Sequence, residues 1–297
     1  GISYASYRVA ELMEELSQYE PDLFIIYTGQ NEFLEKRTYQ KIRDLPGFVV
    51  KLTEILGSTR IYTLMKSILD KTVSKSSNQA RKKYQMTGEV KEILNESVGP
   101  SSYKRDDVLG NDVNAHYLFN LKRMVKKARS VDSEIMFITP VSNYKDMSPF
   151  KSQNGDGLTE TERLRWQELY DSGNSLIKSG ENIEAVSAFQ KALAIDNRHA
   201  ELNYRLGQAL FKLERFAEAK KSFQRAVDED IAPLRILTTM RQALRLVTEK
   251  TEVPLVDFET ILEKIYSREY GHTIFGDEYL IDHVHLTYQG YRLLALA

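Results

Sequence analysis

The sequence predicts an α/β protein in three layers, with helices on both faces of a parallel sheet and an all-helical insertion. Three observations predict this class. Short, almost wholly apolar runs follow amphipathic helical stretches, as in parallel α/β sheets. A fixed period of 34 residues lies between the second and third of these runs. The helix-then-strand order resumes after that repeat, so the repeat interrupts a single sheet domain.

Composition limits the class of protein. The 297 residues include 41 Lys and Arg and 42 Asp and Glu, for a formal net charge of -1. Without an excess of basic charge, nothing indicates nucleic acid as a partner. Cysteine is absent, which excludes disulfides and thiolate metal ligands but fits any compartment. No apolar run approaches the roughly 18 residues that a membrane helix needs.

The first helix and strand are predicted near the start of the chain. Residues 4–18 have apolar positions at helical spacing, with Ser3 as the expected N-cap, and Pro21 ends the helix. Residues 23–27, Leu-Phe-Ile-Ile-Tyr, are typical of a strand buried on both faces. Residues 42–98 are predicted to be helical but irregular. They form either a solvated helical insertion or a cap that faces a membrane or an acyl chain.

A second helix and strand follow. Asp112 begins an amphipathic helix, and residues 135–139 form another apolar strand that Pro140 ends. Residues 152–157, Ser-Gln-Asn-Gly-Asp-Gly, have the composition of a linker. This linker marks the end of the first part of the sheet domain, at about residue 150.

An internal repeat occupies residues 166–233. Five pairs of identical residues lie 34 positions apart: Gly173 and Gly207, Leu176 and Leu210, Ala185 and Ala219, Phe189 and Phe223, and Ala192 and Ala226. Small residues let two helices approach closely, and the aromatic ring fills the space between them. The pattern resembles the tetratricopeptide repeat, in two copies at 166–199 and 200–233. The resemblance implies a helical region over 158–233 that binds a protein or peptide partner or serves only as structure.

The α/β pattern returns after residue 233. The sequence predicts a helix over 234–250, a short strand over 253–257, a helix that starts at Ile261 and a final helix from about Thr287. The sheet domain therefore comprises residues 1–150 and 234–297, with the repeats inserted between them.

Two short blocks carry candidate chemistry. Asp282 and His285 lie three residues apart before the final helix, so the carboxylate can fix the tautomer of the imidazole and stabilise its charged form. Gly29 and Asn31 follow the first strand, where sites form in open parallel sheets. A carboxamide there can donate a hydrogen bond to an oxyanion. Alternatively, the first block is a helix cap with a packed histidine, and the second is an ordinary turn.

Together these blocks resemble the SGNH (GDSL-like) hydrolase family. The Gly-Gln-Asn-Glu block at 29–32 resembles the family's Gly-x-Asn-Asp block, with Glu in place of the last Asp. Asp282 and His285 match its Asp-x-x-His block. Gly1 is a candidate for the glycine of a further block, whose backbone amide helps to form the oxyanion hole. The resemblance covers both parts of the sheet domain and implies a flavodoxin-like fold with no metal or organic cofactor.

The resemblance also assigns roles in a Ser-His-Asp triad. His285 would be the general base, Asp282 would orient its ring, and Asn31, Gly29 and Gly1 would build the oxyanion site. The implied substrate is an acyl ester of a lipid or of an acetylated glycan. Two rival functions remain open: an O-acyltransferase that uses the same residues on a glycan hydroxyl, and a non-catalytic scaffold in which only the repeats bind.

The nucleophile is missing from this pattern. The family's Gly-Asp-Ser block precedes the glycine block, whereas Ser3 and Ser6 fall at the start of a helix. Because the chain opens at Gly1 without Met, we interpret it as a fragment that lacks the nucleophile strand, which would leave an unpaired sheet edge. The alternative is a pseudoenzyme. On the fragment interpretation, an upstream segment could also carry a signal for export or membrane anchoring, so the compartment stays open.

Other polar and aromatic residues are weaker candidates. Asn143 and Phe150 follow the second strand and are expected to shape an acyl or alcohol pocket if the topology is right. His272 is a candidate for the wall of the substrate cleft. His283 is expected on the surface, pointing away from the site, and His116 is expected to pack within the protein.

Overall fold

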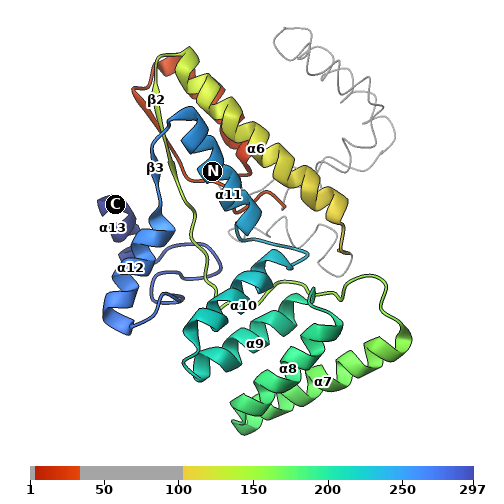
Figure 1. The fold of residues 1–297 in the computed structure, drawn as a ribbon. Coiled ribbons are helices and arrows are strands. Elements are labelled where there is room, and N and C mark those ends of the chain that lie inside the picture. Colours follow the sequence, from red (N-terminus) through yellow and green to blue (C-terminus); the bar gives the residue numbers. More distant parts are fainter. Residues whose placement is uncertain (1–3, 34–102) are drawn as a thin grey trace, which may run out of the picture. The chain divides into compact units, whose positions relative to one another are not determined.

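The computed structural model describes residues 4–33 and 103–297 (Figure 1). Ser3, Gly1 and the whole helical segment predicted at 42–98 lie outside the described residues. The described part is mostly helical and contains a small parallel sheet. Its strands are β1 (Leu23–Ile26), β2 (Glu134–Ile138) and β3 (Leu255–Val256), and its helices are α1 (Ser6–Leu16), α6 (Asp107–Ser130), α7 (Glu160–Ser179), α8 (Asn182–Ile195), α9 (Ala200–Lys212), α10 (Phe216–Asp228), α11 (Thr238–Thr251), α12 (Phe258–Tyr270) and α13 (Tyr288–Leu296).

The sheet joins segments from both sides of the repeat region. Its strand order is β1-β2-β3 and both pairings are parallel. Phe24 pairs with Ile135, and Phe137 pairs with Leu255. Because β3 follows the repeats in the sequence yet pairs with β2, the repeats interrupt the path of the chain through one sheet.

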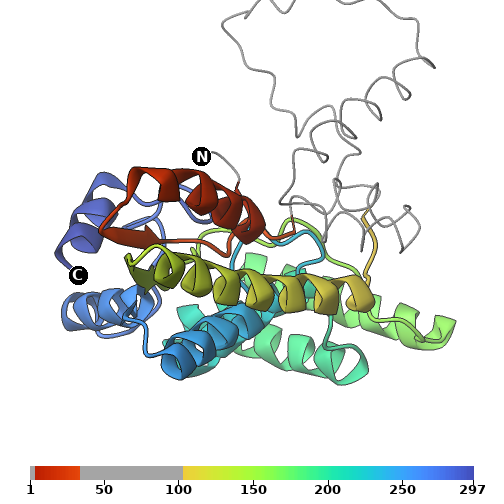
Figure 2. The same ribbon diagram turned by 90° about the horizontal axis from the view of Figure 1, so that it is seen from above.

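Helices lie on both faces of this sheet and cover the second face at β2 and β3. Phe24, Ile26 and Phe137 are buried in a core that includes residues of α1, α6 and α11. Ile138 and Val256 pack instead against a second core built by α12, α13 and the loop before α13. Figure 2 shows α6 lying between α1 and α11, in agreement with the contacts of α6 to each of them. The sheet therefore has two helical layers, although it has only three strands among the described residues.

The first strand differs from its prediction. It was expected to be buried on both faces, but Leu23 is 44% exposed and Ile25 is 58% exposed, while Phe24 and Ile26 are buried. The reason is that β1 lies at the edge of the described sheet, where no helix of the described part covers its second face. The side of β1 away from β2 has no strand partner among the described residues.

Two helix starts also differ from their predictions. Helix α6 begins at Asp107 rather than Asp112, because the side chain of Asp106 accepts a hydrogen bond from the Leu109 amide and caps it. Helix α1 begins at Ser6, and its N-cap is Ala5, whose side chain makes no capping bond. The Ser6 amide instead donates to the carboxylate of Glu32, 2.8 Å away. This helix is thus capped by a residue distant in the sequence.

The repeat region forms two helical hairpins, α7 with α8 and α9 with α10, whose helices pack in chain order (Figure 1). A capping box between Thr159 and Glu162 starts α7. A Cβ atom added at Gly207 would lie 2.7 Å from the ring of Phe223, and one at Gly173 only 2.4 Å from Phe189. The equivalent glycines of the two repeats therefore allow the close helix crossings that the period predicted.

A matched pair of Gly-to-Ala substitutions tests this packing. Gly207→Ala is expected to reduce the free energy of unfolding by about 1–3 kcal/mol, because the buried Phe223 ring must move. Gly110→Ala, in the first turns of α6, meets no atom within 4 Å and is expected to raise it by up to about 1 kcal/mol. Urea denaturation of both variants measures the difference. Equal effects would contradict the packing account.

Candidate functional site

The carboxylate of Asp282 and the imidazole of His285 form a pair. The Nδ1 atom of His285 lies 2.6 Å from Oδ2 of Asp282. The other carboxylate oxygen, Oδ1, accepts the backbone amides of Val284 and His285, both at 2.8 Å. These three bonds fix the carboxylate in a tight turn before α13, so that the ring can be held in one tautomer, with a proton on Nδ1.

The electrostatics of this turn keep Asp282 ionised. Partial burial raises the pKa of its carboxyl, but the hydrogen bonds from the His285 and Val284 amides and from the His285 ring outweigh that effect, so that the pKa is lowered. An ionised carboxylate beside Nδ1 is the arrangement that stabilises a positively charged imidazole.

The second ring nitrogen of His285 is available to a ligand. The side chain is 66% exposed, and Nε2 makes no hydrogen bond within the described part of the chain. An imidazole that is oriented through one nitrogen and open at the other can accept a proton from a hydroxyl group.

The turn at Gly29 follows β1 directly. Gly29 has φ of +128°, and a Cβ there would lie 2.8 Å from Cδ1 of Ile236. Only glycine adopts this backbone without strain, so the turn requires it. Asn31 is half-buried, and its carboxamide makes no hydrogen bond among the described residues. A carboxamide in this state can donate to an oxyanion.

Hydrogen bonds through the segment after β2 connect the two blocks. The side chain of Gln30 donates to the carbonyl of Val141 at 3.2 Å. Two residues further on, the amide of Asn143 donates to the carbonyl of His283 at 2.9 Å. The turn at Gly29 (the glycine turn), the segment after β2 and the turn from Asp282 to His285 (the Asp-His turn) therefore lie side by side at the carboxyl edge of the sheet. No hydrogen bond joins Asn31 directly to His285 among the described residues.

Two buried arginines anchor the segment after β2, and the sequence did not single them out. Nη1 of Arg235 donates to the carbonyls of Asn143 at 2.9 Å and Met147 at 3.0 Å. Nε of Arg241 lies 3.1 Å from the carboxylate of Glu259, which also accepts the hydroxyl of Tyr144. The sequence offers one signal for them, which is their position: Arg235 lies just before the amphipathic helix α11, and Arg241 lies within it.

The weaker candidates take other places. Asn143 is fully buried and donates through its side chain to Asp277, so it fixes a loop rather than lining an open pocket. The ring of Phe150 lies 4.3 Å from that of His283, whose Nε2 is 3.1 Å from the carbonyl of Ser148. His272 packs on aromatic residues of α9, α10 and α12, which places it away from the Asp-His turn. His116 stacks on Phe119.

Glu32, the last residue of the Gly-Gln-Asn-Glu block, was given no role of its own from the sequence. It is 5% exposed, and its two carboxylate oxygens accept the amide and the hydroxyl of Ser6 at 2.8 and 2.7 Å. The side chain of Asn120 donates to the same hydroxyl at 3.1 Å. Burial raises the pKa of Glu32 to about 7, although the bonds from Ser6 lower it. This buried carboxyl group ties the glycine turn to the start of α1.

No serine of the described residues is hydrogen-bonded to His285, and Ser6 is engaged by Glu32. Within 4–33 and 103–297, no group of three or more His, Asp or Glu residues is placed to hold a metal ion. The helices of the described part include none with the length and apolar character required to cross a membrane. Gly1 lies outside the described residues, so its predicted role stays a prediction.

Comparison with known proteins supports the repeat region. A family model described as tetratricopeptide repeat matches residues 176–230, which span most of both predicted copies. Repeats of this kind generally mediate protein–protein interaction through a stacked helical surface. No curated protein matches the chain. The SGNH resemblance therefore remains a hypothesis based on the two sequence blocks.

The buried carboxyl group gives a pH-dependent prediction. The pKa of Glu32 is about 7 in the folded protein against an ordinary 4.5, so the folded state binds this proton more tightly. The stabilising contribution of this group is fully present below pH 4.5. It is lost as pH rises through about 7, which lowers the free energy of unfolding by about 3 kcal/mol. Glu32→Gln should remove that decline.

Urea denaturation between pH 4.5 and 8 measures the effect. The free energy of unfolding of Glu32→Gln relative to the unsubstituted protein should rise across this range. Glu15→Gln, on the exposed side of α1, serves as the control and should leave the profile unchanged. A parallel profile for Glu32→Gln and the unsubstituted protein would show that Glu32 does not titrate in this window.

Proposed function

We propose that the chain is the base-bearing part of a serine ester hydrolase that also carries a protein-binding repeat region. The observation that carries the proposal is the 2.6 Å pair between Asp282 and His285, with Nε2 of the ring left open. It is supported by Gly29 and Asn31 at the same edge of the sheet, where the backbone turn and the carboxamide suit an oxyanion site.

In this reaction His285 takes the proton of a serine hydroxyl through Nε2 as the serine oxygen attacks the acyl carbonyl. Asp282 stays ionised and stabilises the imidazolium ion, consistent with the lowered pKa of its carboxyl group. The carboxamide of Asn31 donates to the oxyanion. The imidazolium then protonates the leaving alcohol, and water releases the acyl group by the same steps in reverse order.

The serine belongs, on this proposal, to a strand that adds to the free edge of β1. That edge has no partner among the described residues, and Leu23 and Ile25 leave an apolar surface on the second face of the strand. A parallel strand added there would end beside the turn at Gly29, since the carboxyl ends of parallel strands meet at one edge. Its last residues would then lie near the open nitrogen of His285.

A second candidate function is a scaffold in which only the repeats are active. The match of residues 176–230 to the tetratricopeptide repeat favours a protein-binding role, whether or not the sheet domain is an enzyme. The two candidate functions differ in what they require of His285. The hydrolase needs its imidazole ring as a base, whereas the scaffold does not.

Turnover of a short-chain acyl ester by the full-length protein tests the hydrolase proposal. His285→Ala is expected to reduce kcat by about 100-fold or more, since general base catalysis is lost. His283→Gln is the matched control in the same loop. Its carboxamide can keep the hydrogen bond to the Ser148 carbonyl, so turnover should stay within a few-fold of the unsubstituted protein.

Circular dichroism establishes that each variant is folded. Absence of turnover in the folded full-length protein would contradict the hydrolase and leave the scaffold. Equal turnover in His285→Ala and in the unsubstituted protein would show that another residue is the base.

A further inference from the structure

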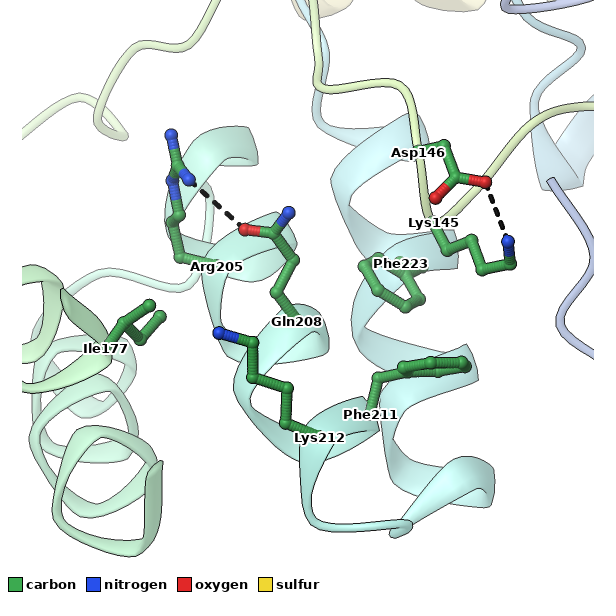
Figure 3. Close-up of a pocket in the computed structure, with 8 residues that line it drawn as sticks. All are labelled: Lys145, Asp146, Ile177, Arg205, Gln208, Phe211, Lys212 and Phe223. Carbon is green, nitrogen blue, oxygen red and sulfur yellow. Dashed lines mark hydrogen bonds and ion pairs between the residues drawn. The ribbon is translucent and has the colours of Figure 1, made fainter. Parts of the chain in front are cut away.

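A cavity of about 400 Å³ lies between α7, α9, α10 and the segment after β2 (Figure 3). Its apolar lining comes from Ile177, Phe211 and Phe223. Its polar lining comes from residues on α9 and from Lys145 and Asp146. The cavity is separate from the Asp-His turn, and none of its residues has been given a role in ester hydrolysis.

One face of α9 carries the polar side chains of this cavity. Arg205, Gln208 and Lys212 are spaced by three and four residues, which places them on the same side of a helix. Figure 3 shows the three side chains lying along α9, with Arg205 bonded to Gln208 at 3.2 Å. Ile177 of α7 faces them from the neighbouring helix in the same view.

The charge on this face is positive and incompletely compensated. Lys145 lies between Asp146, at 2.7 Å, and Glu278, at 2.8 Å, so that its charge is balanced within the protein. Nε of Arg205 lies 2.8 Å from Glu201. Lys212 is exposed and makes no ion pair with any residue that the structure describes. The cavity thus offers an unpaired ammonium group beside the half-buried ring of Phe211.

The wall opposite α9 is held in place before any ligand binds. The carboxylate of Asp146 accepts the amide of Asp277 at 2.9 Å as well as the ammonium group of Lys145. A Cβ at Gly276 would lie 1.9 Å from Oδ2 of Asp146, so glycine is required for this approach. The hydroxyl of Tyr204 donates to the carbonyl of Lys145 at 2.8 Å. A preformed wall reduces the entropy lost on binding.

We propose that this cavity binds an internal peptide segment of a partner protein in which acidic side chains flank an aromatic or leucine side chain. The apolar side chain contacts Ile177 and Phe211, and the flanking carboxylates pair with Lys212 and with the guanidinium group of Arg205. The positive charge of the cavity favours the acidic side chains of the peptide, and the apolar lining favours the aromatic or leucine side chain between them. The inference rests on the protein-binding part of the proposed function and needs no hydrolase activity.

Fluorescence anisotropy with two synthetic peptide pools tests this inference on the full-length protein. The acidic pool contains fluorescein-labelled octapeptides with Phe or Leu flanked by Asp and Glu, and a C-terminal amide removes the terminal carboxylate. The neutral pool has Asn and Gln at the same positions. The acidic pool is expected to bind about 10-fold more tightly, with an advantage that falls as salt is added.

Charge reversal locates the binding. Lys212→Glu is expected to abolish the advantage of the acidic pool, and Arg205→Gln to reduce it. Lys191→Glu, on the exposed side of α8 and outside the cavity, makes the same charge change and should preserve it. Thermal denaturation checks that the variants are folded.

The outcomes separate this inference from the proposed function. Equal binding of both pools would overturn the acidic preference while leaving a protein-binding repeat region intact. Binding of neither pool would overturn the inference, while the protein-binding role, which does not depend on short peptides, would stand on the repeat match alone. An acidic preference that persists in Lys212→Glu would place the site elsewhere on the molecule.

Discussion

The arrangement of the candidate site depends on the buried segment that follows β2. Asn143 is fully buried there, with its amide bonded to the carbonyl of His283 and its side chain bonded to Asp277. Buried backbone groups must find partners, and this segment supplies them to the Asp-His turn on one side and to Gln30 on the other. The buried guanidinium of Arg235 in turn satisfies the carbonyls of Asn143 and Met147. These bonds join the pairing of β1 with β2 and the second core in holding Asp282 and Gly29 at one sheet edge.

The same segment connects the site with the repeats. Lys145 and Asp146 form a wall of the cavity at α9, and their partners Asp277 and Glu278 precede the Asp-His turn by only a few residues. Packed, hydrogen-bonded groups therefore run without a break from the cavity to the loop before the turn. The physical cause of this connection is the path of the chain, because the repeats leave the sheet after β2 and return to it before β3.

Much of this fold was predictable because its signals are local. The strands at β1 and β2 come from apolar runs, and the repeat comes from glycine and phenylalanine at a fixed spacing, which the approach of Gly207 to Phe223 explains. The pairing of Asp282 with His285 was also local, since both lie on one turn. Boundaries were less predictable. The start of α1 depends on Glu32, which is 26 residues away and invisible to local spacing.

The buried arginines that support the site could not be predicted either, because their partners are also distant in the sequence. Arg235 and Arg241 are charged, and charged residues are almost never buried unless they are paired. Their burial becomes plausible only when the carbonyls and the carboxylate that they meet are known. The exposure of Ile25 was likewise not encoded in its own strand, because it depends on which elements cover the sheet edge.

Covalent labelling with a fluorophosphonate probe tests the central claim most directly, since the probe reacts with a serine whose hydroxyl is activated by a base. Intact-mass spectrometry of the full-length protein should show one phosphonyl group added, on a serine, and His285→Ala should abolish the adduct. No adduct on the folded protein, or equal labelling of His285→Ala, would contradict the role assigned to the pair of Asp282 and His285.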